Sequence, residues 1–323
     1  MNISIISDCN NNCEYCFQKE YHQQHKMLSY EEIDDIIQWG VSEPKIGILG
    51  GEPTLHPDIL KIMKRVKEMN RLTMFTNLLC KTELLEKMIE IGDVGYLVNT
   101  TSRDELKDLF YKNFALLHSK RDYLASRQIS FCVGLTLMND EKIDTEHIEN
   151  LFNIINTYPG LVHHVRMGIA TPFHEGTFDL MNYDTPVKYM IDKVMKDYTD
   201  ITIGFDCPSN NCQISPRLMG EALENPRIVN FDLGCREPVL DVLVDKSIKY
   251  CFSFPDDFLV VDNYQRFKNA AEARQWYIMR VTEYMHANAY QCRYSKIGCE
   301  NRVCKGSCPA VNEYLRRQNS TFN

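Results

Sequence analysis

Cysteines are the residues of this chain whose number and spacing bear most directly on chemistry. The chain has 323 residues and 13 cysteines, and such an odd count in a long chain without a secretory signal favours metal ligands or redox groups over a disulfide framework. Most of the cysteines fall into two groups, which predict one metal site near the start of the chain and one in its last third. The groups are Cys9, Cys13 and Cys16, and Cys235, Cys251, Cys292, Cys299, Cys304 and Cys308.

The first group reads Cys9-Asn-Asn-Asn-Cys13-Glu-Tyr-Cys16. Three thiolates in so short a loop can bind three corners of a four-iron, four-sulfur cluster, which normally takes four cysteines. One iron is then left open, as a catalytic metal site requires. A three-cysteine zinc site with a distant fourth ligand remains an alternative on the spacing alone.

The overall composition excludes several classes of partner. Acidic residues outnumber basic ones, 44 to 36, which gives a formal net charge of −8. With no basic run, the chain has no electrostatic footprint for nucleic acid or for an anionic membrane. It also has no apolar run long enough to span a bilayer and no signal stretch, so we expect a cytoplasmic protein.

The elements that must position these cysteines alternate between strand and helix. Six such alternations predict parallel βα units, which are too few to close an eight-stranded barrel. We therefore predict an α/β fold, a partial (β/α)6 TIM-like barrel. The strands are expected at residues 2–7, 45–49, 72–76, 94–100, 129–138 and 164–170, and the helices at 30–39, 57–69, 82–91, 104–126, 145–156 and 185–198.

From about residue 203 the alternation is expected to stop. A β-hairpin is predicted over 239–244 and 248–252, followed by a helix over 269–289 and a cysteine-rich loop. This pattern predicts a small cysteine-rich α+β extension after the barrel, with 208–216 as the linker. The predicted domains are residues 1–205 and 206–323.

Two further motifs lie at the ends of predicted strands. Gly50-Gly51-Glu52-Pro-Thr follows the second strand and Asn77 follows the third, while the first cysteine loop follows the first strand. In barrels of parallel strands the chemistry lies at the carboxyl ends of the strands. We therefore expect these three segments to form one site.

Together these motifs resemble those of the radical S-adenosylmethionine (radical SAM) superfamily. The resemblance rests on the cysteine spacing, on Tyr15 just before the last cysteine, and on the Gly50-Gly51-Glu52 segment. Gly134-x-Thr136-x-Met138 is a partial match to a later adenine-contacting pattern of the family. The resemblance covers about residues 1–200.

The resemblance implies a 4Fe–4S cluster on Cys9, Cys13 and Cys16 whose open iron chelates SAM. Carried over to this chain, the glycine–glycine–glutamate segment would contact the amino group of the methionine part of SAM, and the aromatic residue would lie near the adenine. Residues at further strand ends would add contacts. The cleavage of SAM gives a 5′-deoxyadenosyl radical that removes hydrogen from an unactivated carbon. The residues expected to bind SAM are Gly50, Gly51, Glu52, Tyr15, Asn77, Thr136 and Arg166.

The second cysteine group is similar to the SPASM and Twitch extensions of radical SAM enzymes, which bind auxiliary iron–sulfur clusters. The resemblance implies at least one auxiliary 4Fe–4S cluster on Cys235, Cys251, Cys292, Cys299, Cys304 and Cys308. The pattern departs from the family in the hairpin turn, Asp245-Lys246-Ser247, which lacks a glycine. The pattern also lacks a cysteine after Cys308. A structural zinc site is the alternative to an auxiliary cluster.

Three residues near the barrel mouth are candidates for the substrate chemistry. Arg166 is expected either to point into the barrel and bind SAM or substrate, or to form an ion pair outside it. Asp206 and Cys207, at the domain junction, are the candidate catalytic proton acceptor and donor.

The resemblance also implies the class of reaction. Members with such extensions commonly crosslink, epimerise or oxidise ribosomally made peptides, so a peptide is the expected substrate, with or without a separate peptide-recognition protein. An electron donor such as flavodoxin or ferredoxin is the other expected partner. The alternatives are a radical SAM dehydrogenase or synthase of a small molecule, and a non-enzymatic regulator that binds a cluster or zinc.

Overall fold

The structure is a computed structural model of the whole chain. The residues it describes are 1–13, 15, 16, 18, 19, 21–100, 107–138, 140–170, 183–206, 214–229, 235, 238–288 and 308–320.

The described strands form one curled sheet in the order β10-β9-β1-β2-β3-β4-β5-β6-β7-β8. All neighbours in the sheet are parallel except β9 and β10, which pair antiparallel. The strands are β1 (Asn2–Ser4), β2 (Lys45–Leu49), β3 (Arg71–Thr76), β4 (Val94–Asn99), β5 (Ser130–Leu137), β6 (His164–Ile169), β7 (Thr202–Phe205), β8 (Ile228–Val229), β9 (Asp241–Val242) and β10 (Ile248–Lys249).

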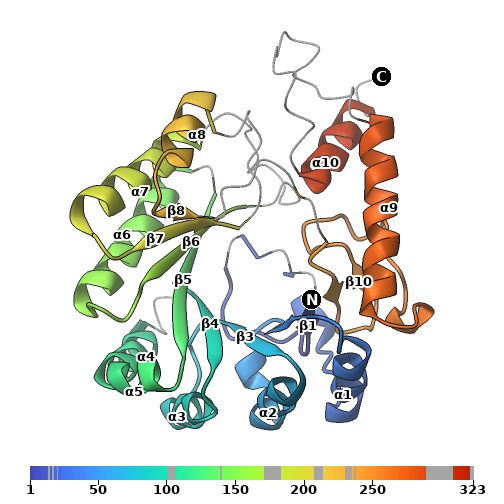
Figure 1. Ribbon diagram of the computed structural model, residues 1–323, viewed down its shortest axis with the longest axis horizontal. Helices are drawn as coiled ribbons and strands as arrows, with labels where there is room; N and C mark the ends of the chain where they lie inside the picture. The colour runs from blue at the N-terminus through green and yellow to red at the C-terminus, as the bar shows by residue number, and fades with distance from the viewer. Residues whose placement is uncertain are drawn as a thin grey trace.

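Helices cover the outside of this curled sheet, as Figure 1 shows. The sheet does not close on itself, so the predicted α/β fold with a partial TIM-like barrel is confirmed. The helices are α1 (Tyr30–Trp39), α2 (Ile59–Met69), α3 (Thr82–Glu90), α4 (Lys107–Ser119), α5 (Arg121–Ser126), α6 (Glu141–Thr157), α7 (Asp184–Asp197), α8 (Pro216–Leu223), α9 (Ala270–Asn288) and α10 (Pro309–Ser320), with 3-10 turns η1 (Tyr21–Gln24), η2 (Pro53–Leu55) and η4 (Tyr264–Arg266).

Several helices begin at residues that cap them. Ser29 precedes α1, and its hydroxyl accepts from the Glu32 backbone N–H while the Glu32 carboxylate accepts from the Ser29 N–H, at 3.2 and 2.9 Å. Asp140 caps α6 through a 3.0 Å bond from the Ile143 N–H. Each such cap stabilises its helix by about 1 kcal/mol.

Two expectations about the elements were wrong. The alternation of strand and helix does not stop near residue 203, because β7, α8 and β8 extend the sheet beyond β6. These strands have only four and two residues, too few to carry a clear period. The long helix expected over 104–126 divides into α4 and α5 at Lys120, and its first residues lie outside the described part.

The predicted hairpin is present, and it joins the main sheet. β9 lies parallel to β1, so the first strand of the chain has neighbours on both sides. Lys246 occupies the left-handed region at φ 70° in place of the usual turn glycine. The Asp245 carboxylate supports the turn by accepting from the Ser247 N–H and hydroxyl, at 3.0 and 2.6 Å.

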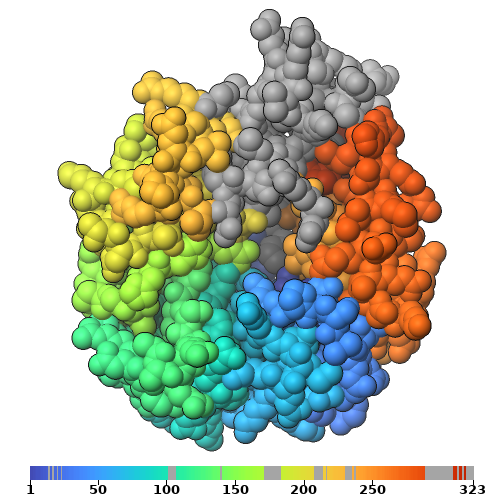
Figure 2. All heavy atoms as spheres, in the orientation of Figure 1, coloured from blue at the N-terminus to red at the C-terminus, as the bar shows by residue number. Residues whose placement is uncertain are grey.

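The two faces of the sheet differ in chemistry. In β4, Tyr96 and Val98 are fully buried on one face, while Asn99 is half-buried on the other. The guanidinium of Arg166 on β6 lies 5.5 Å from the centre of the Phe75 ring on β3. Because these strands are three apart in the sheet, this contact spans the concave side, which is therefore the inner face. Figure 2 shows the same order on the surface, which passes from blue at the lower right through green at the lower left to yellow at the upper left, with orange at the right.

Candidate functional site

The first cysteine loop begins directly after β1 at the carboxyl end of the sheet. Cys9, Cys13 and Cys16 are all free and half-buried. The Cys16 N–H donates to the Cys13 carbonyl at 3.2 Å, so the loop turns back on itself between these two ligands. The loop therefore gathers three thiols at the edge of the sheet where barrel chemistry is expected.

Each of these sulfur atoms lies near an N–H group. The Asn11 backbone N–H donates to Cys9 Sγ at 3.4 Å, and the Asn11 side-chain amide donates to Cys13 Sγ at 3.2 Å. His22 Nε2 lies 3.7 Å from Cys16 Sγ. N–H groups directed at sulfur suit thiolates, which accept hydrogen bonds more strongly than thiols do.

Burial makes these cysteines poor thiolates on their own. It raises the pKa of Cys9 to about 12 and that of Cys13 to about 11, and it also raises the pKa of Cys16. Metal binding requires deprotonated thiols, so a bound cation must supply the charge that offsets this cost. Iron ions of a cluster provide such a charge.

Among the residues that the structure describes, no three His, Cys, Asp or Glu side chains lie close enough together to hold a single metal ion.

The glycine pair packs directly against the cysteine loop. A Cβ on Gly50 would lie 2.3 Å from the Ile6 carbonyl oxygen, and one on Gly51 would lie 2.2 Å from the Asp8 carbonyl oxygen. Gly50 also has φ +156°, at the edge of the region that L side chains avoid. The Gly51 N–H donates to the Ile6 carbonyl at 2.8 Å. Only glycine permits this approach, which fixes the start of the loop.

Glu52 joins the ends of two strands. Its carboxylate is 1% exposed and accepts from the Thr54 N–H and hydroxyl, the Thr76 hydroxyl and the Asn77 N–H, at 3.1, 2.7, 2.8 and 2.8 Å. Burial raises its pKa despite these donors. The carboxylate is thus occupied within the protein, so its predicted contact with the SAM amine stays a prediction.

Asn77 connects this carboxylate to the cysteine loop. Its side-chain amide donates to Asn10 Oδ1 at 2.8 Å and lies 3.9 Å from Cys9 Sγ. Its side-chain oxygen accepts from the Leu79 N–H at 2.9 Å. The predicted site residues of the first three strands are therefore linked by hydrogen bonds.

Tyr15 is buried at the ends of the next strands. Its hydroxyl donates to Asn99 Oδ1 at 2.6 Å, and its ring packs with Met138 and Ala170. These partners end or follow β4, β5 and β6, so Tyr15 extends the site across the sheet. Its predicted position near the adenine stays a prediction. Asn99 was missed from the sequence, although it ends β4 much as Asn77 follows β3.

The inner face carries charged residues deeper in the barrel. Arg166 points inward, as one of its two predicted orientations required, and forms an ion pair with Asp206. Thr136 faces the same space, because a Cβ on Gly168 would lie 3.1 Å from the Asp206 carboxylate and 3.7 Å from the Thr136 hydroxyl. Cys207, the other candidate catalytic residue, lies outside the described residues.

Two basic residues near Arg166 were missed from the sequence. Burial lowers the pKa of Lys45 and of His164, and the positive charge of Arg166 lowers both further. Cys132, on β5, also feels this charge, and burial raises its pKa to about 11. Side chains on β2 and β6 alternate between the two faces of the sheet, so the sequence could have placed both missed residues. Each of them shares the inner face with a glycine of its own strand.

Three cysteines of the second group interact with Tyr250. The Tyr250 hydroxyl lies 3.5 Å from Cys235 Sγ. Burial raises the Tyr250 pKa, and the nearby Cys235, Cys251 and Cys308 raise it further. All three cysteines are therefore in the neighbourhood of Tyr250, although among the described residues no three such side chains are close enough to hold one metal ion. The other predicted ligands, Cys292, Cys299 and Cys304, lie outside the described residues.

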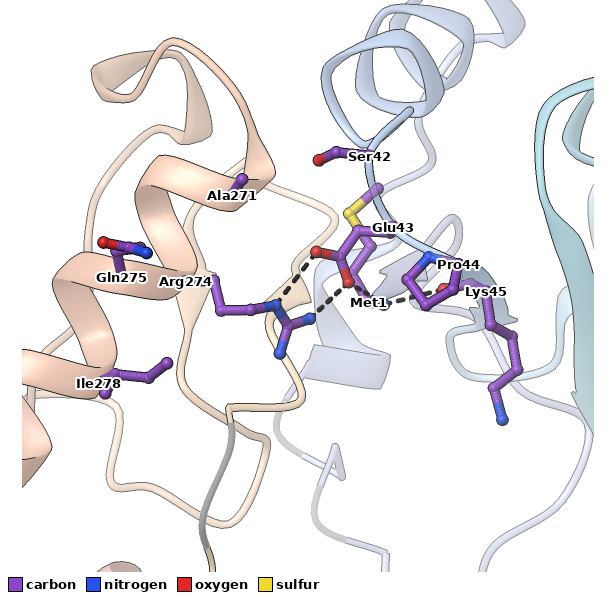
Figure 3. Close-up of a pocket in the computed structure, with 9 residues that line it drawn as sticks. All are labelled: Met1, Ser42, Glu43, Pro44, Lys45, Ala271, Arg274, Gln275 and Ile278. Atoms are coloured by element: carbon purple, nitrogen blue, oxygen red, sulfur yellow. Dashed lines mark hydrogen bonds and ion pairs between the residues drawn. The ribbon is translucent and has the colours of Figure 1, made fainter.

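A cavity of about 510 Å³ lies at the other end of the sheet (Figure 3). It is lined by Met1, by residues 42–45 at the start of β2 and by one side of α9, where Arg274 forms an ion pair with the buried Glu43. Because β2 begins at Lys45 and the cysteine loop lies past the opposite strand ends, this cavity is separate from the candidate site.

Comparison with known proteins shows which family this arrangement is similar to. Residues 3–152 match the family model of the radical SAM superfamily. These residues are therefore similar to radical SAM domains. The radical SAM family implies a 4Fe–4S cluster and SAM as cofactors, and the three half-buried cysteines with N–H donors fit the cluster.

Proteins similar to this chain include cyclases. It is 26% identical to the GTP 3',8-cyclase of Limosilactobacillus fermentum over 80% of each chain. It is 34% identical to the GTP 3',8-cyclase of Thermodesulfovibrio yellowstonii, over 33% of this chain and 36% of that protein. A solved structure described as "Native anSMEcpe with bound AdoMet" shares its fold, with a TM-score of 0.64 at 14% identity, and covers 99% of this chain and 95% of that one.

Within the described ranges, no helix combines the length and apolar character that a bilayer crossing needs.

Proposed function

We propose that this chain is a radical SAM enzyme that acts on an anionic small molecule held on the inner face of the barrel. The observation that carries the proposal is the guanidinium of Arg166, which faces inward. It forms an ion pair there with Asp206 and lies over the Phe75 ring. Phosphate and carboxylate groups are the natural partners of guanidinium and ammonium groups.

The first substrate to test is a nucleoside triphosphate, GTP in particular. The support comes from the relatives that are GTP 3',8-cyclases, one of which matches over 80% of this chain. A triphosphate complements the guanidinium of Arg166. The expected peptide substrate finds less support, because nothing in the described residues favours it over a small molecule.

The cofactors divide the work with the protein. When bound, the cluster and SAM supply a 5′-deoxyadenosyl radical that removes a hydrogen atom from the substrate. Cys9, Cys13 and Cys16 hold the cluster, while the backbone of Gly50 and Gly51 positions the loop that carries them. Asp206, which is held by Arg166, remains the candidate proton acceptor, with Cys207 as its neighbour in sequence.

We also propose an auxiliary 4Fe–4S cluster on the second cysteine group. Its support is the approach of Cys235, Cys251 and Cys308 to Tyr250. A fourth ligand would come from Cys292, Cys299 or Cys304. An electron donor of the flavodoxin or ferredoxin class, and for a peptide substrate a recognition protein, complete the proposed partners.

The function is tested by anaerobic assay with GTP. We expect 5′-deoxyadenosine to form in step with the loss of GTP, and Arg166→Leu to raise the KM for GTP by about tenfold or more. Arg217→Leu is the control, because Arg217 lies on the surface at 88% exposure. Formation of 5′-deoxyadenosine without any loss of GTP would exclude this substrate, and peptides would be assayed next.

A further inference from the structure

The residues around the first cysteine loop offer a role beyond ligand binding. All three sulfur atoms have an N–H group close by, and two of those groups belong to one residue. Asn11 is 6% exposed and spans Cys9 and Cys13, with its backbone N–H on one and its side-chain amide on the other. His22, in the turn η1 that follows the loop, serves Cys16.

Such contacts matter most when the cluster changes charge. Reduction adds one electron from an external donor, and part of the added negative charge resides on the thiolate sulfur atoms. An N–H···S bond is stronger to the more negative sulfur, so it favours the reduced form and raises the reduction potential. When a sulfur atom is bound to iron it carries no proton, so His22 Nε2 must be the donor.

We propose that Asn11 and His22 are positioning residues that set the reduction potential of the cluster on Cys9, Cys13 and Cys16. This proposal rests on the cluster assignment in the proposed function and is independent of the substrate. Loss of either side-chain donor makes the cluster harder to reduce. Since an electron must reach the cluster before SAM can be cleaved, the two residues control how readily the enzyme is activated.

The geometry separates these donors from their neighbours. Asn12 is also in the loop, but its side chain is exposed, and its backbone N–H donates to Asn11 Oδ1 at 3.0 Å. That bond orients the Asn11 amide so that its NH2 group faces Cys13. Asn12 is therefore a matched control of the same residue type.

The test is a redox titration of the reconstituted full-length protein followed by electron paramagnetic resonance, without substrate. The signal of the first cluster is identified because added SAM changes it. For Asn11→Leu and His22→Phe we expect the equilibrium constant for reduction to fall by about tenfold, which is a shift of about 59 mV to lower potential for one electron. His22→Gln keeps an N–H donor and should restore most of the potential, while Asn12→Leu should leave it unchanged.

Each outcome decides the proposal. Iron content equal to the unmodified protein, with unchanged potentials in both variants, would overturn it. If Asn11→Leu alone loses iron, the reduction potential of His22→Phe decides the proposal. If both variants lose iron, the two residues have a purely structural role, and the proposal is overturned. Failure of the substrate assignment would leave these potentials unaffected, so the two proposals fail separately.

Discussion

The two cysteine groups are assembled in different ways. Cys9, Cys13 and Cys16 come from one short loop, and the ends of β1, β2 and β3 hold that loop through Gly51, Glu52 and Asn77. Cys235, Cys251 and Cys308 come from separate segments that only the folded chain brings together around Tyr250. The first site is therefore set by local sequence, whereas the second depends on tertiary contacts far along the chain.

Removal of ligands is expected to have the largest effect and to separate the two sites. The variant with Cys9, Cys13 and Cys16 all replaced by alanine should lose all cleavage of SAM and about one cluster's iron. Cys235→Ala with Cys308→Ala should lower the iron count but leave the SAM-dependent signal. Iron counting and assay of 5′-deoxyadenosine check both results. Equal losses in the two variants would mean that the groups do not form separate sites.

Glu52 tests whether the strand ends hold the first site. In Glu52→Gln, one carboxylate oxygen becomes an NH2 group, which cannot accept hydrogen bonds from the buried donors that face it. We therefore expect the free energy of unfolding to fall by about 3 kcal/mol. Urea denaturation of the unloaded protein measures this. The control is Glu68→Gln, whose carboxylate is 64% exposed beside Arg65 and should change stability by less than about 1 kcal/mol. Equal effects would remove the special role of Glu52.

Replacement of Gly51 tests whether its close contact with the first cysteine loop is needed for SAM binding. In Gly51→Ala the new methyl group would meet the Asp8 carbonyl at 2.2 Å, so the loop must shift. We expect SAM affinity to fall by about tenfold, measured by equilibrium binding to the reconstituted protein. Gly220→Ala is the control, since a Cβ there meets nothing within 4 Å. Unchanged affinity in Gly51→Ala would show that the loop tolerates the shift.

Glu313 tests the dependence of the second site on distant contacts. Its buried carboxylate accepts from Arg316 and Arg317 in α10, the helix that begins just after Cys308. The two guanidinium groups lower the pKa of Glu313 to about 2. We expect Glu313→Gln to lower stability by about 1 kcal/mol at pH 7 and to loosen the iron of the second site only.

The pH dependence of this effect has a definite sign. The folded pKa of Glu313 lies below its ordinary value of 4.5, so its stabilisation is present at neutral pH and is lost as the pH falls from about 4.5 toward 2. The difference in urea midpoint between the unmodified protein and Glu313→Gln should therefore narrow over that range. Glu283→Gln, on an exposed pair in α9, is the control. A difference that grows on acidification would contradict the assignment.

The sequence predicted the first site better than the second. The cysteine spacing and the glycine pair are local patterns, and each follows a strand that alternation made visible. The role of Glu52 as a link between strand ends was not predictable, because it depends on Thr76 and Asn77 from the next strand. Lys45 was missed for a similar reason, since β2 and β6 are far apart in the sheet and only its curl brings Lys45 toward Arg166. His164 lies two residues before Arg166 on β6, so strand alternation could have indicated it.

The short elements after residue 200 were the hardest to predict. β7 and β8 have too few residues to show a period, and their place in the sheet comes from pairing with β6. The hairpin was predicted, but its pairing with β1 was not, because that contact joins opposite ends of the chain.

The central claim is that the first cysteine loop binds a cluster with an iron left open for SAM. The most direct measurement is electron paramagnetic resonance of the reconstituted, reduced protein before and after SAM is added. We predict that SAM alters the signal of one cluster, that 5′-deoxyadenosine follows, and that the signal is absent when Cys9, Cys13 and Cys16 are replaced by alanine. A spectrum that SAM leaves unchanged in an iron-replete protein, with no 5′-deoxyadenosine, would contradict the claim.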